Sequence, residues 1–171
     1  SPIFMDTAGT VKKTCDWITR AGDEDVDLVV FPEVFLPGFP YWINCYPPLM
    51  QGALNRRYHD AAIERNGKEI QELAACAEEN SVSIVVGFCE REVDGHTLYN
   101  SMAFIDGDGR VLGIHRKLQP TFAERYIWGR GDASSLFVVE GSVGRIGGLA
   151  CWEHTMNLAR QALVEKKQEI H

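Results

Sequence analysis

The apolar run from Val26 to Phe31 places the tightest limit on the fold of this chain. Only Asp27 interrupts the run, and Pro32 ends it. A strand that is apolar at nearly every position has both faces covered, as in a parallel or mixed sheet, whereas a strand with one solvated face alternates apolar and polar residues. The chain must therefore supply packing layers on both sides of a sheet, which favours an α/β fold.

Two segments have the apolar spacing of amphipathic helices. Residues 7–22 place Val11, Cys15 and Ile18 on one stripe, and residues 67–79 carry a second apolar stripe. Both segments are of ordinary helix length, and they lie on either side of the first strand along the chain. We therefore expect two amphipathic helices over these residues.

The remaining elements follow from apolar runs and turn signals. The turn Asp106-Gly-Asp-Gly109 predicts a hairpin, because Asp-Gly pairs adopt the backbone that tight turns need. Residues 36–48 combine proline with aromatic side chains and are expected to line a pocket, while residues 51–66 fit either a helix or a loop. The other expected elements are strands over 81–92, 99–106, 110–114, 135–139 and 145–150, and a helix over 153–167 with Leu158, Ala162 and Leu163 facing inward. No repeat or linker interrupts them, so residues 1–171 are expected to form a single domain.

Composition excludes several classes of function. The chain of 171 residues has a formal net charge of −7 and a pI of about 5.2, without any cluster of Lys or Arg. This charge disfavours binding to nucleic acid or to an anionic membrane. No apolar stretch approaches the roughly 20 residues of a membrane span. A cytoplasmic enzyme of small molecules is the expectation.

The five cysteines are widely and irregularly spaced. An odd number at such spacing does not indicate a disulfide framework and fits a reducing compartment. Cys15 and Cys76 lie on apolar helix faces and Cys89 lies in a strand, so these three are expected to act as small core residues. Cys45 lies in the aromatic loop and is left unassigned.

Chemically active side chains follow three of the expected strands. Glu33 comes directly after the first strand, Lys117 follows the strand that ends near Ile114, and Cys151 follows the strand over 145–150. A thiol between a strand and a helix N-terminus experiences the positive end of the helix dipole, which favours the nucleophilic thiolate. A carboxylate, an ammonium and a thiol at strand ends are the groups that acyl transfer needs.

Four segments together resemble signature blocks of the nitrilase family, within the carbon–nitrogen hydrolase superfamily. They occur in the family's order and span nearly the whole chain. In this sequence they are Phe31-Pro-Glu-Val-Phe-Leu-Pro-Gly-Phe-Pro-Tyr-Trp, His115-Arg-Lys-Leu-Gln-Pro-Thr, Glu124-Arg-Tyr-Ile-Trp-Gly-Arg-Gly-Asp and Gly147-Gly-Leu-Ala-Cys-Trp-Glu-His. The resemblance implies a four-layer α-β-β-α sandwich that is truncated at both ends, with the C-terminal half of the family fold outside residues 1–171.

The resemblance also implies a set of site residues. Glu33, Lys117 and Cys151 would form a catalytic triad, with Glu124 as a further active-site carboxylate. Cys151 would be the nucleophile, Glu33 the general base, and Lys117 the group that stabilises negative charge together with the backbone N–H of Trp152. An ordinary salt bridge from Glu124 to Arg125 or Arg130 is an equally good interpretation of that carboxylate.

The reaction implied is the hydrolysis of an organic nitrile to a carboxylic acid and ammonia through a thioimidate and a thioester, without a metal or organic cofactor. Trp152 and Tyr41 are candidates for shaping the substrate pocket, although large aromatic residues usually belong to a core. The family commonly forms homo-oligomers, so a homo-oligomer is expected here. The Cys-Trp-Glu sequence at the nucleophile and the aromatic loop after Glu33 resemble nitrilases more than amidases.

Several alternatives stay open at this point. Amidase, cyanide-hydrating or carbamoylase activity would use the same triad, and the chain could be an inactive fragment of such an enzyme. Met156 stands where the family pattern has a proline, which affects how the following helix starts. Cys151 and His154 have C-x-x-H spacing, but a zinc site would need a second pair of ligands at similar spacing, and the other histidines are scattered.

Overall fold

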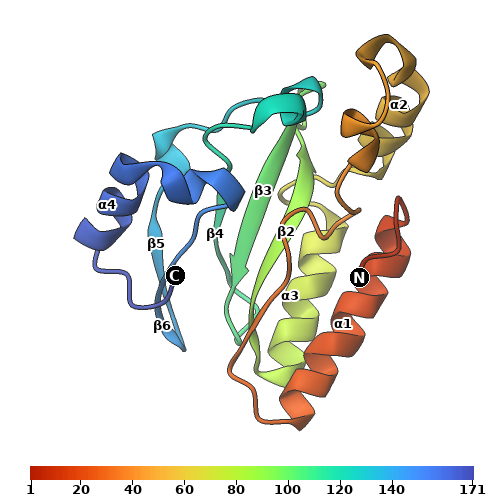
Figure 1. Cartoon of the computed structure of the whole chain (residues 1–171). Coiled ribbons are helices and arrows are strands. Elements are labelled where there is room, and N and C mark those ends of the chain that lie inside the picture. The colour runs from red at the N-terminus through yellow and green to blue at the C-terminus, as the bar shows by residue number, and fades with distance from the viewer.

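The computed structural model describes residues 1–171 as four layers (Figure 1). Two helices, α1 (Thr7–Asp23) and α3 (Lys68–Asn80), pack beside each other on a four-stranded sheet. A two-stranded sheet packs on the other face of that sheet, and α4 (Asn157–Glu165) covers the second sheet. The helix α2 (Gly52–Ala61) lies at one end of this stack. The order of layers is the α-β-β-α sandwich that the family resemblance implies.

The larger sheet has the order β1-β2-β3-β4. Its strands are β1 (Leu28–Val30), β2 (Ser83–Arg91), β3 (Leu98–Ile105) and β4 (Val111–Arg116). The β1–β2 pair is parallel, whereas β2–β3 and β3–β4 are antiparallel, so the sheet is mixed. The smaller sheet is the antiparallel hairpin of β5 (Val138–Gly141) and β6 (Gly144–Gly147).

The expectation that the first strand is covered on both faces is confirmed only in part. Val29 packs against the core under the helices and Leu28 against the core between the sheets, but the cover does not reach Val30. The strand β1 lies at the edge of the sheet, and Val30 is 65% exposed. The strand buried along almost its whole length is β2, because it lies between β1 and β3 and is covered by the helices on one face and by the second sheet on the other. The apolar run over 26–31 therefore marks a mixed sheet correctly, but it does not show which strand is central.

Each gap between layers has its own apolar core. The largest cluster lies between the two helices and the sheet and includes Ile18, Leu73 and Phe88. A second joins the two sheets through Val85 and Phe104 on one side and residues of the hairpin on the other. A third joins the hairpin to α4. None of the helices combines the length and the apolar character that crossing a membrane requires.

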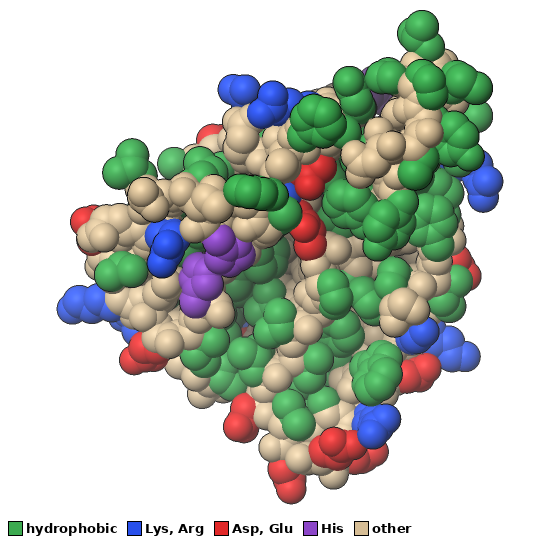
Figure 2. Space-filling view, viewed as in Figure 1, with side chains coloured by type: hydrophobic (Ala, Val, Ile, Leu, Met, Phe, Trp, Pro, Cys, Tyr) green, Lys and Arg blue, Asp and Glu red, His purple; other side chains and the backbone are tan.

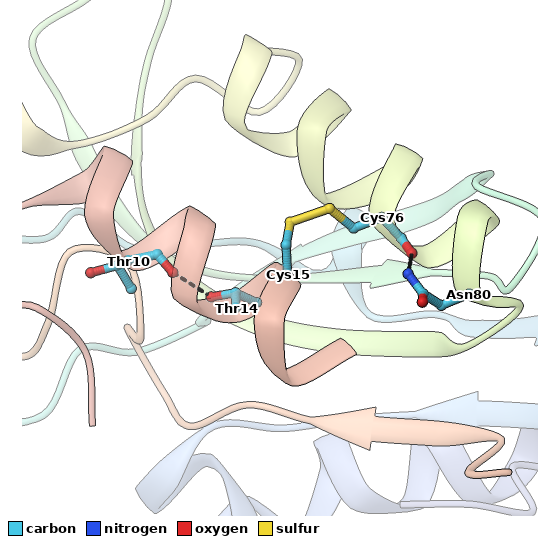
Figure 3. The surroundings of a disulfide bond; sticks show 5 residues. All are labelled: Thr10, Thr14, Cys15, Cys76 and Asn80. Atoms are coloured by element: carbon cyan, nitrogen blue, oxygen red, sulfur yellow. Dashed lines mark hydrogen bonds between the residues drawn. A yellow bond between two sulfur atoms is a disulfide. The ribbon is translucent and has the colours of Figure 1, made fainter. Parts of the chain in front are cut away.

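Cys15 and Cys76 form a disulfide, which contradicts the expectation that both are reduced core residues. Figure 3 shows the bond joining α1 to α3, with Cα atoms 5.7 Å apart. Both cysteines lie on the apolar stripes of their helices, and these stripes pack against each other, so the two sulfur atoms meet. Cys89 is fully buried as expected, and burial raises the pKa of its thiol to about 12.

The C-terminal helix begins later than the sequence predicts. A short 3-10 helix, Cys151–Thr155, comes first, and α4 runs only from Asn157 to Glu165. Ala159 and Leu163 form the buried face, whereas Leu158 is 87% exposed, so the prediction that Leu158 faces inward is wrong. The delayed start changes which residues of the helix point toward the hairpin.

Candidate active site

Lys117 lies between two carboxylates. Its Nζ atom donates hydrogen bonds of 2.7 Å to Oε1 of Glu33 and 2.8 Å to Oε2 of Glu124. The lysine is 1% exposed, so its charge is held within the protein. The partner of Glu124 is therefore Lys117, and the alternative of a bridge to Arg125 or Arg130 is wrong.

The sheet and a short helix bring these three residues together. Glu33 follows the C-terminal end of β1, and Lys117 follows β4, where its backbone N–H donates to the carbonyl of Asn100 on β3. Glu124 lies in the 3-10 helix Phe122–Tyr126, whose N-cap is Thr121. The backbone N–H of Thr121 donates to Oε2 of Glu124 at 2.7 Å, which holds the carboxylate toward Lys117.

Cys151 lies beside the same two carboxylates. Its sulfur, one oxygen of Glu33 and one oxygen of Glu124 all lie within 4.8 Å of one another. The residue is exposed and its thiol is free. It starts the 3-10 helix that follows β6, so the expected position after a strand is present, but the helix behind it has a single turn and not the length assumed for a strong dipole.

The backbone is strained beside each of these residues. Cys151 has a φ of 53°, Val34 next to Glu33 has 47°, and Phe122 near Glu124 has 47°. Residues other than glycine rarely adopt this left-handed backbone conformation, and β-branched residues such as valine adopt it least of all. Residues with such strained backbones are often found at functional sites. Three of them surround one cluster here, which indicates a site whose geometry is held at a cost in stability.

Gly87 on β2 allows the segment of Glu33 to approach the sheet closely. A Cβ at this position would lie 2.5 Å from the carbonyl oxygen of Pro32 and 2.8 Å from Cα of Glu33. Those distances are below any contact that real Cβ atoms make, so only glycine fits. The position of the Glu33 backbone therefore depends on Gly87.

Electrostatics keep Lys117 charged. Burial of the ammonium lowers its pKa, but the hydrogen bonds from Lys117 to Glu124 and Glu33 outweigh this, and the pKa is raised above its ordinary value. Glu33, Glu124 and Cys151 also offer ligand atoms at a spacing that could suit a metal ion. The ammonium of Lys117 already bridges the two carboxylates as a cation, so this donor set fits a metal poorly. His154 does not belong to this cluster, and its Nδ1 lies 2.7 Å from the carbonyl oxygen of Cys151.

Two hollows adjoin the cluster. A small cavity of about 190 Å³ contains Cys151, Glu124 and Trp152, with Phe39, Ile43 and Phe122 as further apolar lining. A larger groove of about 600 Å³ runs from Glu33 and Tyr41 along β1, and apolar side chains gather across this face in Figure 2. Trp152 thus lines the cavity of the thiol, whereas Tyr41 lines the groove of Glu33. Both aromatic residues are largely exposed, at 63% and 67%.

Sequence reasoning missed Asn100. Its Nδ2 donates to Oε1 of Glu33 at 2.7 Å, and the residue is 3% exposed. Because Lys117 and Asn100 both bind Oε1, no hydrogen bond of the protein occupies Oε2 of Glu33. Asparagine is depleted in strands, so an asparagine within the apolar strand 98–105 was a signal that the sequence offered.

The comparisons with known proteins agree with this architecture. The family model described as carbon-nitrogen hydrolase matches residues 1–171. Over its whole length the chain is 39% identical to a nitrilase of Paraburkholderia phymatum and 44% identical to a bifunctional nitrilase/nitrile hydratase of Oryza sativa subsp. japonica. It covers 50% and 49% of those proteins, so the chain spans about half the length of these curated relatives.

Solved structures show the same fold. Nit3 of Saccharomyces cerevisiae, a member of branch 10 of the nitrilase superfamily, matches 98% of this chain and 57% of its own, with a TM-score of 0.73 and 21% identity. A mutant amidase of the nitrilase superfamily from Nesterenkonia AN1 matches 98% of this chain and 59% of its own, with a TM-score of 0.69 and 16% identity. The family model over all 171 residues, together with relatives near 40% identity, shows that this chain belongs to the carbon–nitrogen hydrolase family.

Proposed function

We propose that this protein hydrolyses an organic nitrile to a carboxylic acid and ammonia, with Cys151 as the nucleophile. The observation that supports this most is the sulfur of Cys151 lying within 4.8 Å of carboxylate oxygens of Glu33 and Glu124, of which Glu33 has an oxygen free to take a proton. The named relatives are a nitrilase and a bifunctional nitrilase/nitrile hydratase, which supports a nitrile substrate.

The proposed reaction has two covalent halves. The thiol proton of Cys151 passes to Oε2 of Glu33, the sulfur adds to the nitrile carbon, and the nitrogen is protonated to give a thioimidate. A water adds to this carbon, the C–N bond breaks and ammonia leaves, so that a thioester remains. A second water, deprotonated by Glu33, releases the acid and restores the thiol. In sum, a nitrile and two waters give an acid and ammonia.

The other residues stabilise charge and orient groups in this proposal. The ammonium of Lys117 faces the centre where negative charge develops, together with the backbone N–H of Trp152. Glu124 holds Lys117 in place and is less accessible than Glu33, since its side chain is 8% exposed against 24% for Glu33. Trp152 and Tyr41 would contact the organic part of the substrate, and no cofactor takes part.

Amide hydrolysis is the second candidate. One relative is a bifunctional nitrilase/nitrile hydratase, and structural neighbours include an amidase, so both nitrogen substrates occur among similar proteins. Cyanide hydration and carbamoyl hydrolysis use the same charge stabilisation. In this proposal residues 1–171 belong to a single domain, and the protein acts as a homo-oligomer.

The chain covers half the length of its relatives, so we propose activity for the protein that contains these residues together with the matching second half. The apolar groove along β1 and the exposed Val30 support this proposal, because both present apolar surface that a further layer could cover. An inactive fragment is the alternative for the chain alone. Cytoplasmic localisation is also a proposal, and the Cys15–Cys76 disulfide counts against it.

A direct test measures ammonia and acid release from a panel of nitriles and from the matching amides. We expect equal amounts of acid and ammonia from a nitrile, and no turnover by Cys151→Ala. Cys45→Ala is the matched control, because Cys45 is also a free and exposed thiol. Turnover of amides alone would refute the nitrile proposal, and turnover of neither by an assembled, folded protein would refute hydrolysis.

A further inference from the structure

A further carboxylate, Glu153, is buried beside the cluster of Glu33, Lys117, Glu124 and Cys151. It is 1% exposed, and its two oxygens accept hydrogen bonds from two different chain segments. Oε1 accepts from the backbone N–H of Leu118 at 2.7 Å, and Oε2 accepts from the backbone N–H of Ala150 at 2.7 Å. The Nε2 atom of His115 lies 3.2 Å from both oxygens.

The groups that donate to Glu153 lie next to Lys117 and Cys151 in the chain, the two residues whose relative position matters in the proposed reaction. Leu118 directly follows Lys117, and His115 precedes it by two positions on β4. Ala150 directly precedes Cys151. A single side chain is therefore bonded to the backbone beside the ammonium and to the backbone beside the thiol.

His115 is itself fixed in this arrangement. Its Nδ1 lies 2.9 Å from the carbonyl oxygen of Ser135, which can only accept a hydrogen bond. With Nε2 facing the carboxylate of Glu153, both ring nitrogens have a partner on a neighbouring segment, and these contacts fix the orientation of the ring. Burial raises the pKa of Glu153, but the bonds from His115, Ala150 and Leu118 outweigh this and lower it, so the carboxylate stays ionised.

We propose that Glu153 is a positioning residue that sets the distance between Lys117 and Cys151, with His115 holding the carboxylate on the side of β4. This inference rests on the proposed function. Glu153 touches neither substrate nor reacting atoms, and it acts through the two segments it joins. The left-handed backbone of Cys151 needs such an anchor, because a strained residue persists only where its surroundings hold it.

Removing the charge of Glu153 should disturb this geometry. In Glu153→Gln an amide group replaces one oxygen, so an N–H₂ faces either the N–H of Leu118 or that of Ala150. Two N–H donors then face each other in the protein interior, and the segment of Leu118 or of Ala150 loses its hydrogen bond to residue 153. A shift of about 1 Å between reacting groups is enough to cost about 100-fold in turnover.

The test does not need a substrate. Iodoacetamide alkylates free thiols, and peptide mapping by mass spectrometry gives separate rates for Cys151 and for Cys45, which serves as an internal reference in the same chain. We expect the ratio of the Cys151 rate to the Cys45 rate to fall about tenfold in Glu153→Gln, because the thiolate loses the nearby ammonium. Glu153→Asp keeps the charge and both acceptors and should recover part of the ratio.

Asp106→Asn is the matched control. Asp106 is also a buried carboxylate that joins two segments, Ser83 and Ser142, but it follows β3 at the end opposite to Lys117. We expect it to lower the melting temperature without changing the ratio. An equal change of the ratio in Asp106→Asn and Glu153→Gln, or no change in either, would overturn the proposal, since the role of Glu153 would then be stability alone.

The double mutant Lys117→Met with Glu153→Gln tests whether Glu153 affects the reactivity of Cys151 through the position of Lys117. If Glu153 acts by placing Lys117, Lys117→Met and Glu153→Gln each lower the ratio, and the combined variant lowers it no further. Additive effects would contradict the proposal. Should Glu153→Gln fail to fold, His115→Gln gives the same comparison while leaving the bonds to Ala150 and Leu118. A protein that turns over no nitrile but shows this coupling would refute the proposed function and keep the inference.

Discussion

At the scale of single residues, the site is defined by one ammonium shared between two unequal carboxylates. Glu33 has a free oxygen and an exposed fraction of 24%, whereas Glu124 is held by Thr121 and is 8% exposed. The two acids therefore suit different tasks, proton transfer for Glu33 and support of Lys117 for Glu124. Lys117 stabilises both acids and also faces the position of the reacting carbon in the proposed mechanism.

Replacing Lys117 with methionine should lower kcat by about 10²–10³-fold, since the loss of one group that stabilises developing charge has this size. The variant should also unfold more easily, because Glu33 and Glu124 are left facing each other without a cation. Steady-state kinetics and thermal unfolding measure the two effects. Lys68→Met, at an exposed position on α3, should change neither, and wild-type kcat in Lys117→Met would contradict the assigned role.

The side chains that we propose to act directly were named from sequence, whereas their supports were not. Glu33, Lys117 and Cys151 follow apolar strands and stand in recognisable blocks, which is a local signal. The supporting contacts form only when β3, β4 and the segment of Cys151 come together in the fold, so the sequence alone does not reveal the roles of Asn100, His115 and Glu153. The disulfide was missed for the same reason, because the pairing of Cys15 with Cys76 depends on how two helices pack.

At the scale of elements, close approach between a strand and the site loop is a requirement. Gly87→Ala should displace the backbone of Glu33, since the new Cβ would lie 2.6 Å from the backbone nitrogen of Val34. We expect a loss of about 1–3 kcal/mol in stability, as is typical of overpacking, and a clear fall in kcat. Chemical denaturation and kinetics test this.

Gly52→Ala is the control for that substitution, because no atom lies within 4 Å of a Cβ placed there, at the start of α2. It should be neutral or slightly stabilising. If Gly87→Ala retained both stability and kcat, the backbone of Glu33 would not depend on this contact.

Asp106 joins the β3–β4 turn of the larger sheet to the β5–β6 turn of the smaller sheet. Because its carboxyl group titrates, we expect the stability of the protein to depend on pH. Burial raises the pKa of Asp106, but hydrogen bonds from Ser142, Ser83 and the N–H of Gly107 outweigh this, and the pKa is lowered below its ordinary 3.8. A carboxyl group with a lowered folded-state pKa contributes stability above its unfolded pKa and loses it as the pH falls through the folded value. The contribution is therefore present at neutral pH and is lost below pH 3.8.

Asp106→Asn should be less stable than the wild type at neutral pH, and the difference should shrink as the solution is acidified below pH 3.8. Denaturant unfolding at a series of pH values measures this difference. A difference that stays constant across the series would show that ionised Asp106 does not contribute the stability assigned to it.

At the scale of the whole molecule, the four layers agree with what the family resemblance implies. The cover expected on both faces of the first strand is incomplete, because Val30 is exposed. Helical and strand patterns report which face of an element is apolar, and they gave α1, α3 and the β3–β4 hairpin near their observed bounds. The strands expected over 135–139 and 145–150 are shifted from β5 and β6 by up to three residues. These patterns do not report the order of strands, so they could not show that β1 lies at the edge of the sheet. They also placed the start of α4 too early, because a 3-10 turn that begins at Cys151 precedes the helix.

The disulfide joins the two helices of the outer layer across 61 residues of sequence. A cross-link that closes a loop of this length contributes about 4 kcal/mol through the entropy of the unfolded chain. Cys15→Ala with Cys76→Ala should lower stability by up to that amount while leaving kcat unchanged, since the bond lies on the far side of the sheet from Cys151. Thiol titration of the unfolded, unreduced protein should find three free thiols. Five would contradict the bond.

The central claim is that the sulfur of Cys151 forms the covalent bond to the substrate carbon. Quenching the protein in acid during turnover of a nitrile, followed by peptide mass spectrometry, measures this directly. We predict an added mass equal to the thioimidate or thioester on the peptide that contains Cys151, and none on the peptide of Cys45. Turnover that continues in Cys151→Ala, or an adduct on another residue, would contradict the account.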